Sequence, residues 1–284
     1  MAAALLSFAL LAATTGARAG AGPAPKITLR YFDSRGRAEP IRLTLAALGL
    51  TWDEVVYDRC GDRCPPGVED WPSAKAQGIE SGVLSFGQVP SMSYTDQITG
   101  QTFELVQSQA ILRFLGRRHD FAGTCPSEEI LVDVTMGGVD DMRAAYSKLV
   151  YNQDILTDKS LMNTYVEEYL PLWLGHFERL LLRAGGEFFG GSAFSIADTF
   201  AFDILDHNLR VAPRCLDSFP TLDKFHDDIG HKHGLWEYLQ GGEYSQFPQR
   251  RERANGNSAF FDTPTRPPRG TGHIGPMKEF KPDL

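Results

Sequence analysis

The sequence lacks the glycine-rich signatures that bind nucleotides and the motif that presents a catalytic serine. Neither a P-loop nor a dinucleotide-binding glycine fingerprint occurs, and the glycine pairs at 185–186 and 190–191 have the setting of a turn between helices. No Gly-x-Ser-x-Gly segment is present either. These absences argue against nucleotide-driven enzymes, dinucleotide-dependent dehydrogenases and α/β-type serine hydrolases.

Positive charge and long apolar runs are also scarce. The 284 residues carry a formal net charge of −8, which argues against nucleic acid as a partner. The apolar stretch at 2–13 is too short to span a bilayer, so no stable membrane span is expected. With 42% hydrophobic residues, a chain of this length favours a soluble protein of two modest domains.

The first residues have the pattern of a removable targeting peptide. The apolar stretch at 2–13 is followed by Ala17-Arg18-Ala19, which fits the small-residue rule for cleavage. Arg18 is the only charged residue before Lys26, so a secretory signal and an organellar transit peptide both fit. We predict a targeting peptide over 1–25 that leads to the secretory pathway or an organelle, with the cytoplasm as the alternative.

Cysteine is sparse as well, and its spacing does not indicate a metal site. Cys60 and Cys64 are close in sequence, in Cys-Gly-Asp-Arg-Cys, and no two further ligands lie nearby at zinc spacing. Two free thiols or a local disulfide therefore both remain open, and no metal is predicted. The histidines also lack metal spacing and are expected at the surface or its boundary; they include His119, His207, His231 and His233.

The first half of the chain has the pattern of a compact α/β layer over residues 26–120. A strand at 27–31 is followed by helical spacing at 41–48, a second strand at 51–57, a hairpin formed by 89–94 and 102–105, and a helix over 107–115. Pro40 falls near the first turn of its helix, where its missing N–H matters little.

The second half, residues 121–248, is expected to be all helical. Long helical patterns cover 128–150 and 161–183, the latter with a kink at Pro171. Ser195-Ile196-Ala197-Asp198 predicts a capping box at the start of another helix. Residues 249–284 are rich in Gly, Pro, Asn and Arg without apolar periodicity, and we predict a disordered tail.

Four segments in this order resemble a known family. Tyr31-Phe32 followed by Arg35-Gly36-Arg37-Ala38-Glu39-Pro40 resembles the opening of tyrosine-type cytosolic glutathione transferases. Phe86 to Pro90, Val106 to Leu112 and Ser195 to Asp198 resemble the family's later motifs. The helical half looks most like the pi class, whereas Asp70-Trp71-Pro72 with Lys75 is closer to the sigma class. The resemblance implies a thioredoxin-like N-terminal domain, an all-α C-terminal domain, and glutathione as co-substrate without a metal.

The resemblance also implies the catalytic chemistry. A thiol of pKa near 8.5 is only about 3% thiolate at pH 7, and the thiolate is the nucleophile. Lowering its pKa by about two units requires about 2.7 kcal/mol of preferential anion stabilisation. Tyr31 is expected to donate a hydrogen bond to the glutathione thiolate, with Arg37 supporting it electrostatically. On its own, Tyr31 would be an ordinary strand tyrosine.

Other positions acquire roles from the same resemblance. At Pro90 the family uses a cis bond, through which the backbone of Val89 would pair with the cysteinyl unit, whereas the sequence alone favours an ordinary turn proline. A helix N-terminus would hold the glutamyl carboxylate. Phe32 and Tyr151 would line the electrophile pocket, while Asp141 and Phe86 would act across a homodimer interface. The expected glutathione contacts are Trp71, Lys75, Gln88, Val89, Pro90, Gln107, Ser108 and Asp141.

These residues predict an enzyme that conjugates glutathione to electrophilic hydrophobic substrates, with glutathione-dependent peroxidase or isomerase activity as further options. One alternative is a non-catalytic binding or structural protein on the same scaffold. A thiol–disulfide oxidoreductase is a weaker one, because Cys60 and Cys64 are spaced Cys-x3-Cys and follow the second strand.

Overall fold

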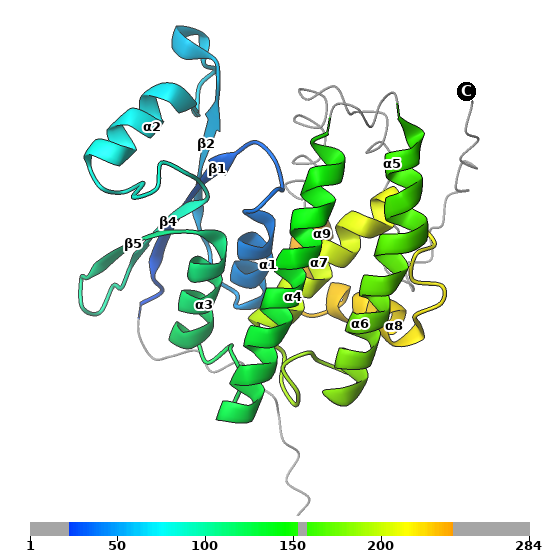
Figure 1. Ribbon diagram of the computed structural model, residues 1–284. Helices are drawn as coiled ribbons and strands as arrows, with labels where there is room; N and C mark the ends of the chain where they lie inside the picture. The colour runs from blue at the N-terminus through cyan, green and yellow to red at the C-terminus, as the bar shows by residue number, and fades with distance from the viewer. Residues whose placement is uncertain (1–22, 153–157, 241–284) are drawn as a thin grey trace, which may run out of the picture.

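The computed structural model describes residues 23–152 and 158–240. Most of the predicted targeting peptide and the whole predicted tail at 249–284 lie outside the described residues. An α/β unit and a helical unit lie side by side (Figure 1). This arrangement is the predicted pairing of a thioredoxin-like domain with an all-α domain.

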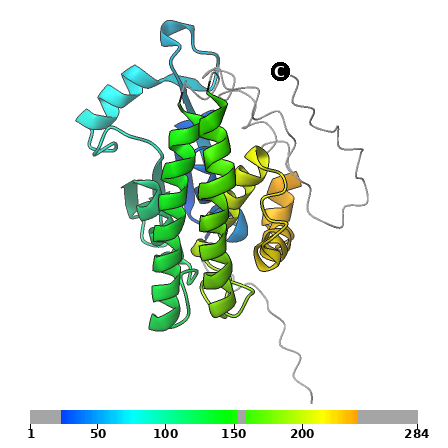
Figure 2. The ribbon, with the colours of Figure 1, turned by 45° about the vertical axis from the view of Figure 1, so that its right-hand side comes forward.

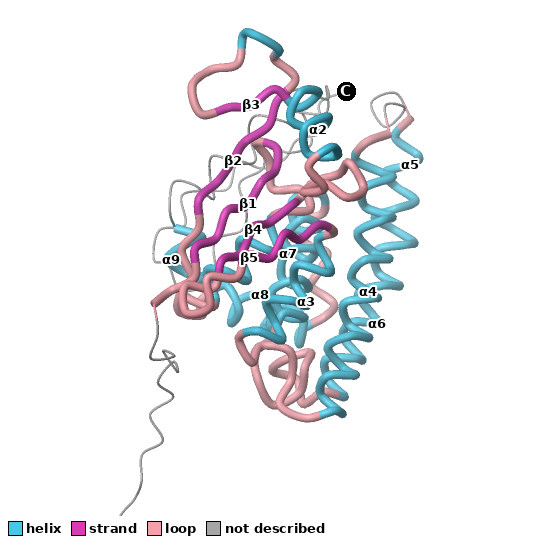
Figure 3. The backbone as a smooth tube through the Cα atoms, turned by 90° about the vertical axis from the view of Figure 1, so that its left-hand side faces the viewer, coloured by secondary structure: helices cyan, strands magenta, loops and turns pink. Residues whose placement is uncertain are grey.

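The α/β unit contains a five-stranded mixed sheet, with strand order β3-β2-β1-β4-β5 (Figure 3). β2 is parallel to β1 and β3, whereas β4 is antiparallel to β1 and β5. Buried and less buried residues alternate along β1, as the sequence pattern requires. The strands are β1 Lys26–Phe32, β2 Asp53–Asp58, β3 Val68–Asp70, β4 Ser91–Thr95 and β5 Thr102–Val106.

Helices cover both sides of this sheet. α1 (Glu39–Ala47) and α3 (Ser108–Arg118) lie on the side that faces the helical unit, and both contact it through α7 (Figure 1). α2 (Trp71–Glu80) lies apart from them and follows the short 3-10 helix Gly61–Arg63 and β3.

The helical unit is built around the buried helix α7 (Ile196–Val211). α4 and α6 run alongside each other in two views (Figures 1 and 2). Ser195 and Asp198 form the predicted capping box: the Asp198 carboxylate accepts from the Ser195 N–H, and the Ser195 hydroxyl accepts from the N–H of Ala197 in the first turn of the helix. The remaining elements are α4 Pro126–Val150, α5 Lys159–Thr164, a π-helical turn Tyr165–Tyr169, α6 Leu170–Arg183, α8 Pro220–Gly230 and α9 Leu235–Gln240.

Two features differ from the sequence-based expectations. β3 and α2 were not expected, because β3 has three residues and α2 buries only Trp71, so neither has an apolar repeat. The irregularity near Pro171 is a π-helical turn ahead of α6, and Pro171 lies in the first turn of α6, where proline is tolerated. Within the described ranges, no helix combines the length and the apolar character needed to cross a membrane.

Candidate functional site

Tyr31 lies near the end of β1, with 8% of its surface exposed. Its hydroxyl oxygen accepts a hydrogen bond from the backbone N–H of Arg37 at 3.1 Å. The chain can approach the ring this closely because residue 36 is a glycine. Gly36 has a φ of +42°, and a Cβ there would lie 2.5 Å from the Tyr31 hydroxyl. The turn between β1 and α1 is therefore folded directly onto the phenol.

The side chain of Arg37 contacts the helical unit. Its Nη1 lies 3.5 Å from a carboxylate oxygen of Asp140 on α4, and nearly half of the side chain is exposed. Arg37 was predicted to support Tyr31 through its guanidinium. The structure places the amide of Arg37 at the hydroxyl and pairs the guanidinium with the helical unit.

Two buried arginines near the turn connect it to α7. Arg35 donates to Asp206 at 2.7 Å, and Arg143 of α4 forms an ion pair with Asp203. Arg143 also donates to the carbonyl oxygen of Gly36 at 3.4 Å. Neither Arg143 nor the two aspartates was predicted for the site. The available signal was the pair of aspartates within the apolar pattern of the helix at 196–211, because ionised groups are seldom buried without partners.

The first turn of α2 lies beside Phe32, the neighbour of Tyr31 in the chain. Trp71 is 7% exposed, and its ring lies 5.2 Å from that of Phe32 between centroids. Lys75 Nζ is 5.9 Å from the centre of the Trp71 ring, and the Lys75 stem passes over Gly87. The predicted contacts Trp71 and Lys75 are thus next to each other, and Lys75 lies beside the residue that precedes Gln88.

Strand register brings the remaining predicted glutathione contacts together. Ser91 at the start of β4 pairs with Val106 at the end of β5, so the residues just before β4 and just after β5 are neighbours. The Val89–Pro90 bond is cis, and Gln107 donates to Gln88 at 3.4 Å. Ser108 is the first residue of α3.

The backbone at the start of α3 is unusual. Gln107 has a φ of +71°, which is uncommon for a residue with a side chain. As the N-cap of α3 it provides no side-chain hydrogen bond to the helix. A helix N-terminus without a side-chain cap favours an external carboxylate at that end.

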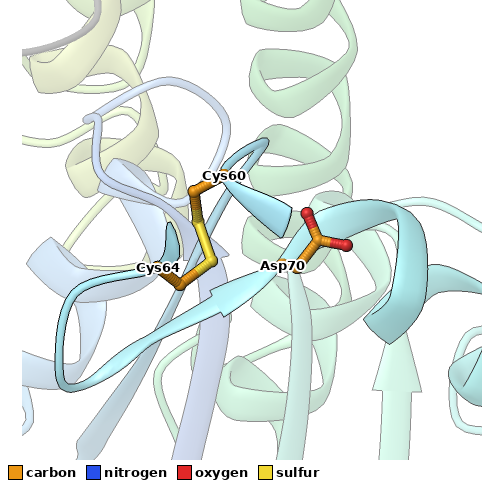
Figure 4. A group of neighbouring side chains, drawn as sticks. All are labelled: Cys60, Cys64 and Asp70. Carbon is orange, nitrogen blue, oxygen red and sulfur yellow. A yellow bond between two sulfur atoms is a disulfide. The ribbon is translucent and has the colours of Figure 1, made fainter. Parts of the chain in front are cut away.

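The β2–β3 loop is closed by a Cys60–Cys64 disulfide, which resolves the alternatives left by the sequence (Figure 4). One carboxylate oxygen of Asp70 accepts from the Gly61 amide at 2.9 Å, and the other caps α2 through Ser73. The Gly61 amide and the Ser73 hydroxyl lower the pKa of Asp70. The two sulfurs and Asp70 lie within 4.8 Å of one another, but the sulfurs are bonded and are not free thiolates for a metal.

Three other predicted residues lie farther along the site. Phe32 packs between the rings of Tyr31 and Trp71. Tyr151 follows α4 and is 63% exposed, and Asp141 is exposed on α4 beside Asp140. Phe86, in the loop between α2 and β4, is 68% exposed.

The expectation for the histidines was wrong at one position. His207 is 6% exposed and lies inside α7 near Asp203, 3.6 Å from its carboxylate. Burial lowers the pKa of His207 to about 3, and the surrounding Arg35, Arg143 and Arg210 act in the same direction. His207 is therefore neutral at physiological pH.

Comparisons with known proteins agree with this architecture. A family model described as the C-terminal domain of glutathione S-transferase matches residues 140–242. The chain is 35% identical to glutathione S-transferase P 1 of Bufo bufo over 226 residues, which cover 79% of this chain and 96% of that protein. It is 32% identical to glutathione S-transferase P of Homo sapiens, with the same coverage.

Solved structures give the same picture. The pi-class glutathione S-transferase of Onchocerca volvulus superimposes with a TM-score of 0.63 at 31% identity, over 78% of this chain and 96% of that one. A sigma-class enzyme of Fasciola hepatica superimposes with a TM-score of 0.64 at 27% identity, over 76% and 96%.

Proposed function

This chain belongs to the glutathione S-transferase family, and from that premise we propose that Tyr31 activates the thiol of glutathione for attack on a hydrophobic electrophile. The protein is an enzyme that transfers glutathione. Glutathione-dependent peroxidase or isomerase activity at the same site is part of the proposal, because both use the same activated thiolate.

The observation that carries this proposal is the hydrogen bond from the Arg37 amide to the Tyr31 hydroxyl. An oxygen that already accepts an N–H becomes a better O–H donor, and its own proton remains available for an external acceptor. A thiolate at that place would receive a charge-assisted hydrogen bond, which lowers the pKa of the thiol. The phenol is thus poised as a donor to an anion.

The surrounding residues support a peptide in extended form next to Tyr31. The backbone of Val89 would pair with the cysteinyl unit, and the start of α3 with Gln107 and Ser108 would hold the glutamyl carboxylate. Trp71 and Lys75 would contact the glycyl end, with Gln88 between the two ends. The electrophile would lie against Phe32 and Tyr151.

A Tyr31→Phe variant tests the assignment. We expect the turnover number for a chromogenic aryl halide to fall about 100-fold at pH 6.5, because about two pKa units of thiol stabilisation are lost. The dissociation constant for glutathione should change less than about threefold, since most contacts with the peptide remain. Turnover and binding are measured by steady-state kinetics and calorimetry.

Tyr94→Phe is the matched control. Tyr94 is a buried strand tyrosine of the same sheet whose hydroxyl contacts His119, away from the site. Its substitution should leave turnover near the wild-type value. Equal losses of turnover and glutathione affinity in Tyr31→Phe would contradict the catalytic role. A wild-type protein that binds glutathione but has no transferase activity would favour the non-catalytic alternative.

The proposal includes a homodimer, in which Asp141 of one protomer reaches the glutathione amino group of the other. The exposed side chains of Phe86, Ile130 and Val134 support it, because large exposed apolar side chains favour an interface.

The leader is proposed to direct the chain to the secretory pathway or an organelle. The Cys60–Cys64 disulfide supports an oxidising compartment. Cell fractionation with N-terminal mass spectrometry tests this proposal, and an uncleaved cytosolic protein would contradict it.

A further inference from the structure

Arg143 lies on the far side of the peptide group that contacts the catalytic phenol, and we propose that it is a positioning residue for Tyr31. The inference depends on the proposed function, because it assigns Arg143 a part in the reaction through Tyr31. Arg143 does not touch the hydroxyl itself. It acts through the peptide group that joins Gly36 to Arg37.

The geometry of one peptide group carries this inference. Arg143 Nη1 donates to the Gly36 carbonyl oxygen at 3.4 Å, and the Arg37 N–H donates to the Tyr31 hydroxyl at 3.1 Å. These two atoms belong to the same peptide unit. In a trans peptide the C=O and the N–H point in opposite directions, so the guanidinium and the phenol lie on opposite sides of one rigid plane.

This arrangement has an electrostatic consequence. A guanidinium at the carbonyl oxygen polarises the peptide, and a polarised peptide is a stronger N–H donor because hydrogen bonds in a chain reinforce one another. The Tyr31 oxygen therefore receives a better donor, and its own O–H becomes a better donor to sulfur. Arg143 also fixes the orientation of the plane, which keeps the Arg37 N–H directed at the phenol.

Arg143 is itself held rigidly from the helical unit. It is 4% exposed, it pairs with Asp203, and its guanidinium carbon lies 5.1 Å from the centre of the Phe200 ring. Asp203 also lies 3.7 Å from Arg35, which precedes Gly36 in the same turn. The turn beside Tyr31 thus takes its position from α4 and α7 of the other unit.

A measured pH dependence must be attributed to Arg143 and not to the other charged groups around the turn. Burial lowers the pKa of His207 to about 3, so it does not titrate between about pH 5 and 8. His226 of α8 faces Asp206 and is present unchanged in every variant below. Further charged groups at the turn and on the helices packed against it include Asp33, Arg35, Arg37, Glu39, Arg42, Asp140, Asp141, Asp203, Asp206 and Arg210.

The test compares Arg143→Lys and Arg143→Met with the wild type. Arg143→Lys keeps a cation for Asp203 and preserves the fold, whereas Arg143→Met removes both the charge and the donor. The thiol of bound glutathione is titrated by ultraviolet absorbance of the thiolate, and kcat/KM is measured from pH 5.5 to 8.5. In Arg143→Met we expect the midpoint of the thiol titration, and the acid limb of the kcat/KM profile, to move to higher pH by about half to one unit. Arg143→Lys should show a smaller shift.

The Tyr31→Phe background separates this inference from the proposed function. If Arg143 acts through the phenol, Arg143→Lys should shift the thiol titration in wild-type protein but not in Tyr31→Phe. If Tyr31→Phe itself leaves the titration unchanged, the proposed function fails. If Tyr31→Phe shifts it and neither Arg143 variant does, only the positioning role fails.

Arg113→Lys provides a matched control. Arg113 of α3 pairs at 2.9 Å with Asp133 of α4, the helix that also carries Arg143. Among the described residues, the hydrogen bonds and the ion pair of Arg113 do not involve the turn between β1 and α1. The titration of the bound thiol in Arg113→Lys should coincide with that in the wild type. An equal shift in Arg113→Lys, or a loss of kcat/KM in Arg143→Lys that is uniform across the pH range, would overturn the inference.

Discussion

At the scale of single residues, Gly36 is a position of the site that has no room for a side chain. A Cβ at residue 36 would overlap the Tyr31 hydroxyl, and the φ of +42° is unfavourable for residues with side chains. We expect Gly36→Ala to lower kcat/KM at least about tenfold and to destabilise the protein by about 1–3 kcal/mol, because the turn must move and its backbone is strained. Kinetics and chemical denaturation measure the two effects.

Gly100→Ala separates backbone strain from damage to the site. Gly100 also has a positive φ, of +71°, but a methyl group added at that place in the β4–β5 hairpin would have no neighbouring atom within 4 Å. Its substitution should reduce stability while leaving kcat/KM unchanged. A Gly36→Ala protein with full activity would show that the turn does not have to pack against the phenol.

Residues whose role depends on local sequence could be predicted, whereas those that act across space could not. Ser195 and Asp198 are three residues apart, so their mutual capping follows from the sequence alone. Arg143 and Gly36 are 107 positions apart, and only the packing of α4 against the turn brings them together. For the same reason, the sequence could not show that the Arg37 amide contacts Tyr31 while its guanidinium pairs with Asp140.

At the scale of elements, the disulfide-closed loop is coupled to the helix that carries Trp71 and Lys75. Asp70 joins the two, because it accepts from Gly61 inside the Cys60–Cys64 ring and caps α2 through Ser73. Opening the ring frees the Gly61 amide and weakens the fixed position of Asp70. The first turn of α2 would then lose part of its support.

The double variant Cys60→Ser with Cys64→Ser tests this coupling. We expect the KM for glutathione to rise about two- to fivefold with kcat nearly unchanged, because the contacts proposed for α2 are with the peptide and not with the reacting sulfur. A five-residue ring contributes about 2 kcal/mol of loop entropy, so the loss of stability should not exceed that amount. Cys125→Ser, at an exposed free cysteine, is the control. An unchanged KM in the double variant would rule out the coupling.

The elements that the sequence failed to predict share a physical cause. β3 is three residues long, and α2 buries a single side chain, so neither contains the repeat by which buried faces are recognised. Both are held by tertiary contacts, with β3 paired to β2 and Trp71 packed against Tyr57 and Phe32. In contrast, α4 and α6 have long apolar repeats, and the helical patterns predicted at 128–150 and 161–183 cover them, the second also including α5 and the π-helical turn.

At the scale of the whole molecule, the sequence predicted two units but not how they are joined. The junction contains buried ion pairs from Arg35 and Arg143 to α7, and a hydrogen bond of 2.7 Å between Thr44 and Thr199. Polar groups buried together in this way fix relative orientation, because any shift leaves a charge without its partner. The proposed glutathione contacts of the α/β unit are thereby held in one alignment with the helical unit that carries Tyr151.

The described exposed side chains also support a second copy of the chain beside this one. Phe86 is 68% exposed in a loop next to Gly87, where the Lys75 stem lies. Asp141 is exposed on α4, on the helix that also carries the exposed apolar residues Ile130 and Val134. If α4 and the Phe86 loop form the interface, dissociation removes the partner's Asp141 from each glutathione site.

Phe86→Ser should therefore weaken both assembly and glutathione binding. Loss of an aromatic side chain from a partner pocket costs about 2–4 kcal/mol, so the dimer dissociation constant should rise about 30- to 1000-fold. Light scattering measures mass, and the KM for glutathione should rise as the protein is diluted through that dissociation constant. Ile98→Ser, at a 72% exposed residue of the β4–β5 hairpin, should change neither quantity.

Asp141→Asn should raise the KM for glutathione while the protein stays dimeric. A wild-type protein that is monomeric at micromolar concentration with an undiminished affinity for glutathione would contradict the shared site.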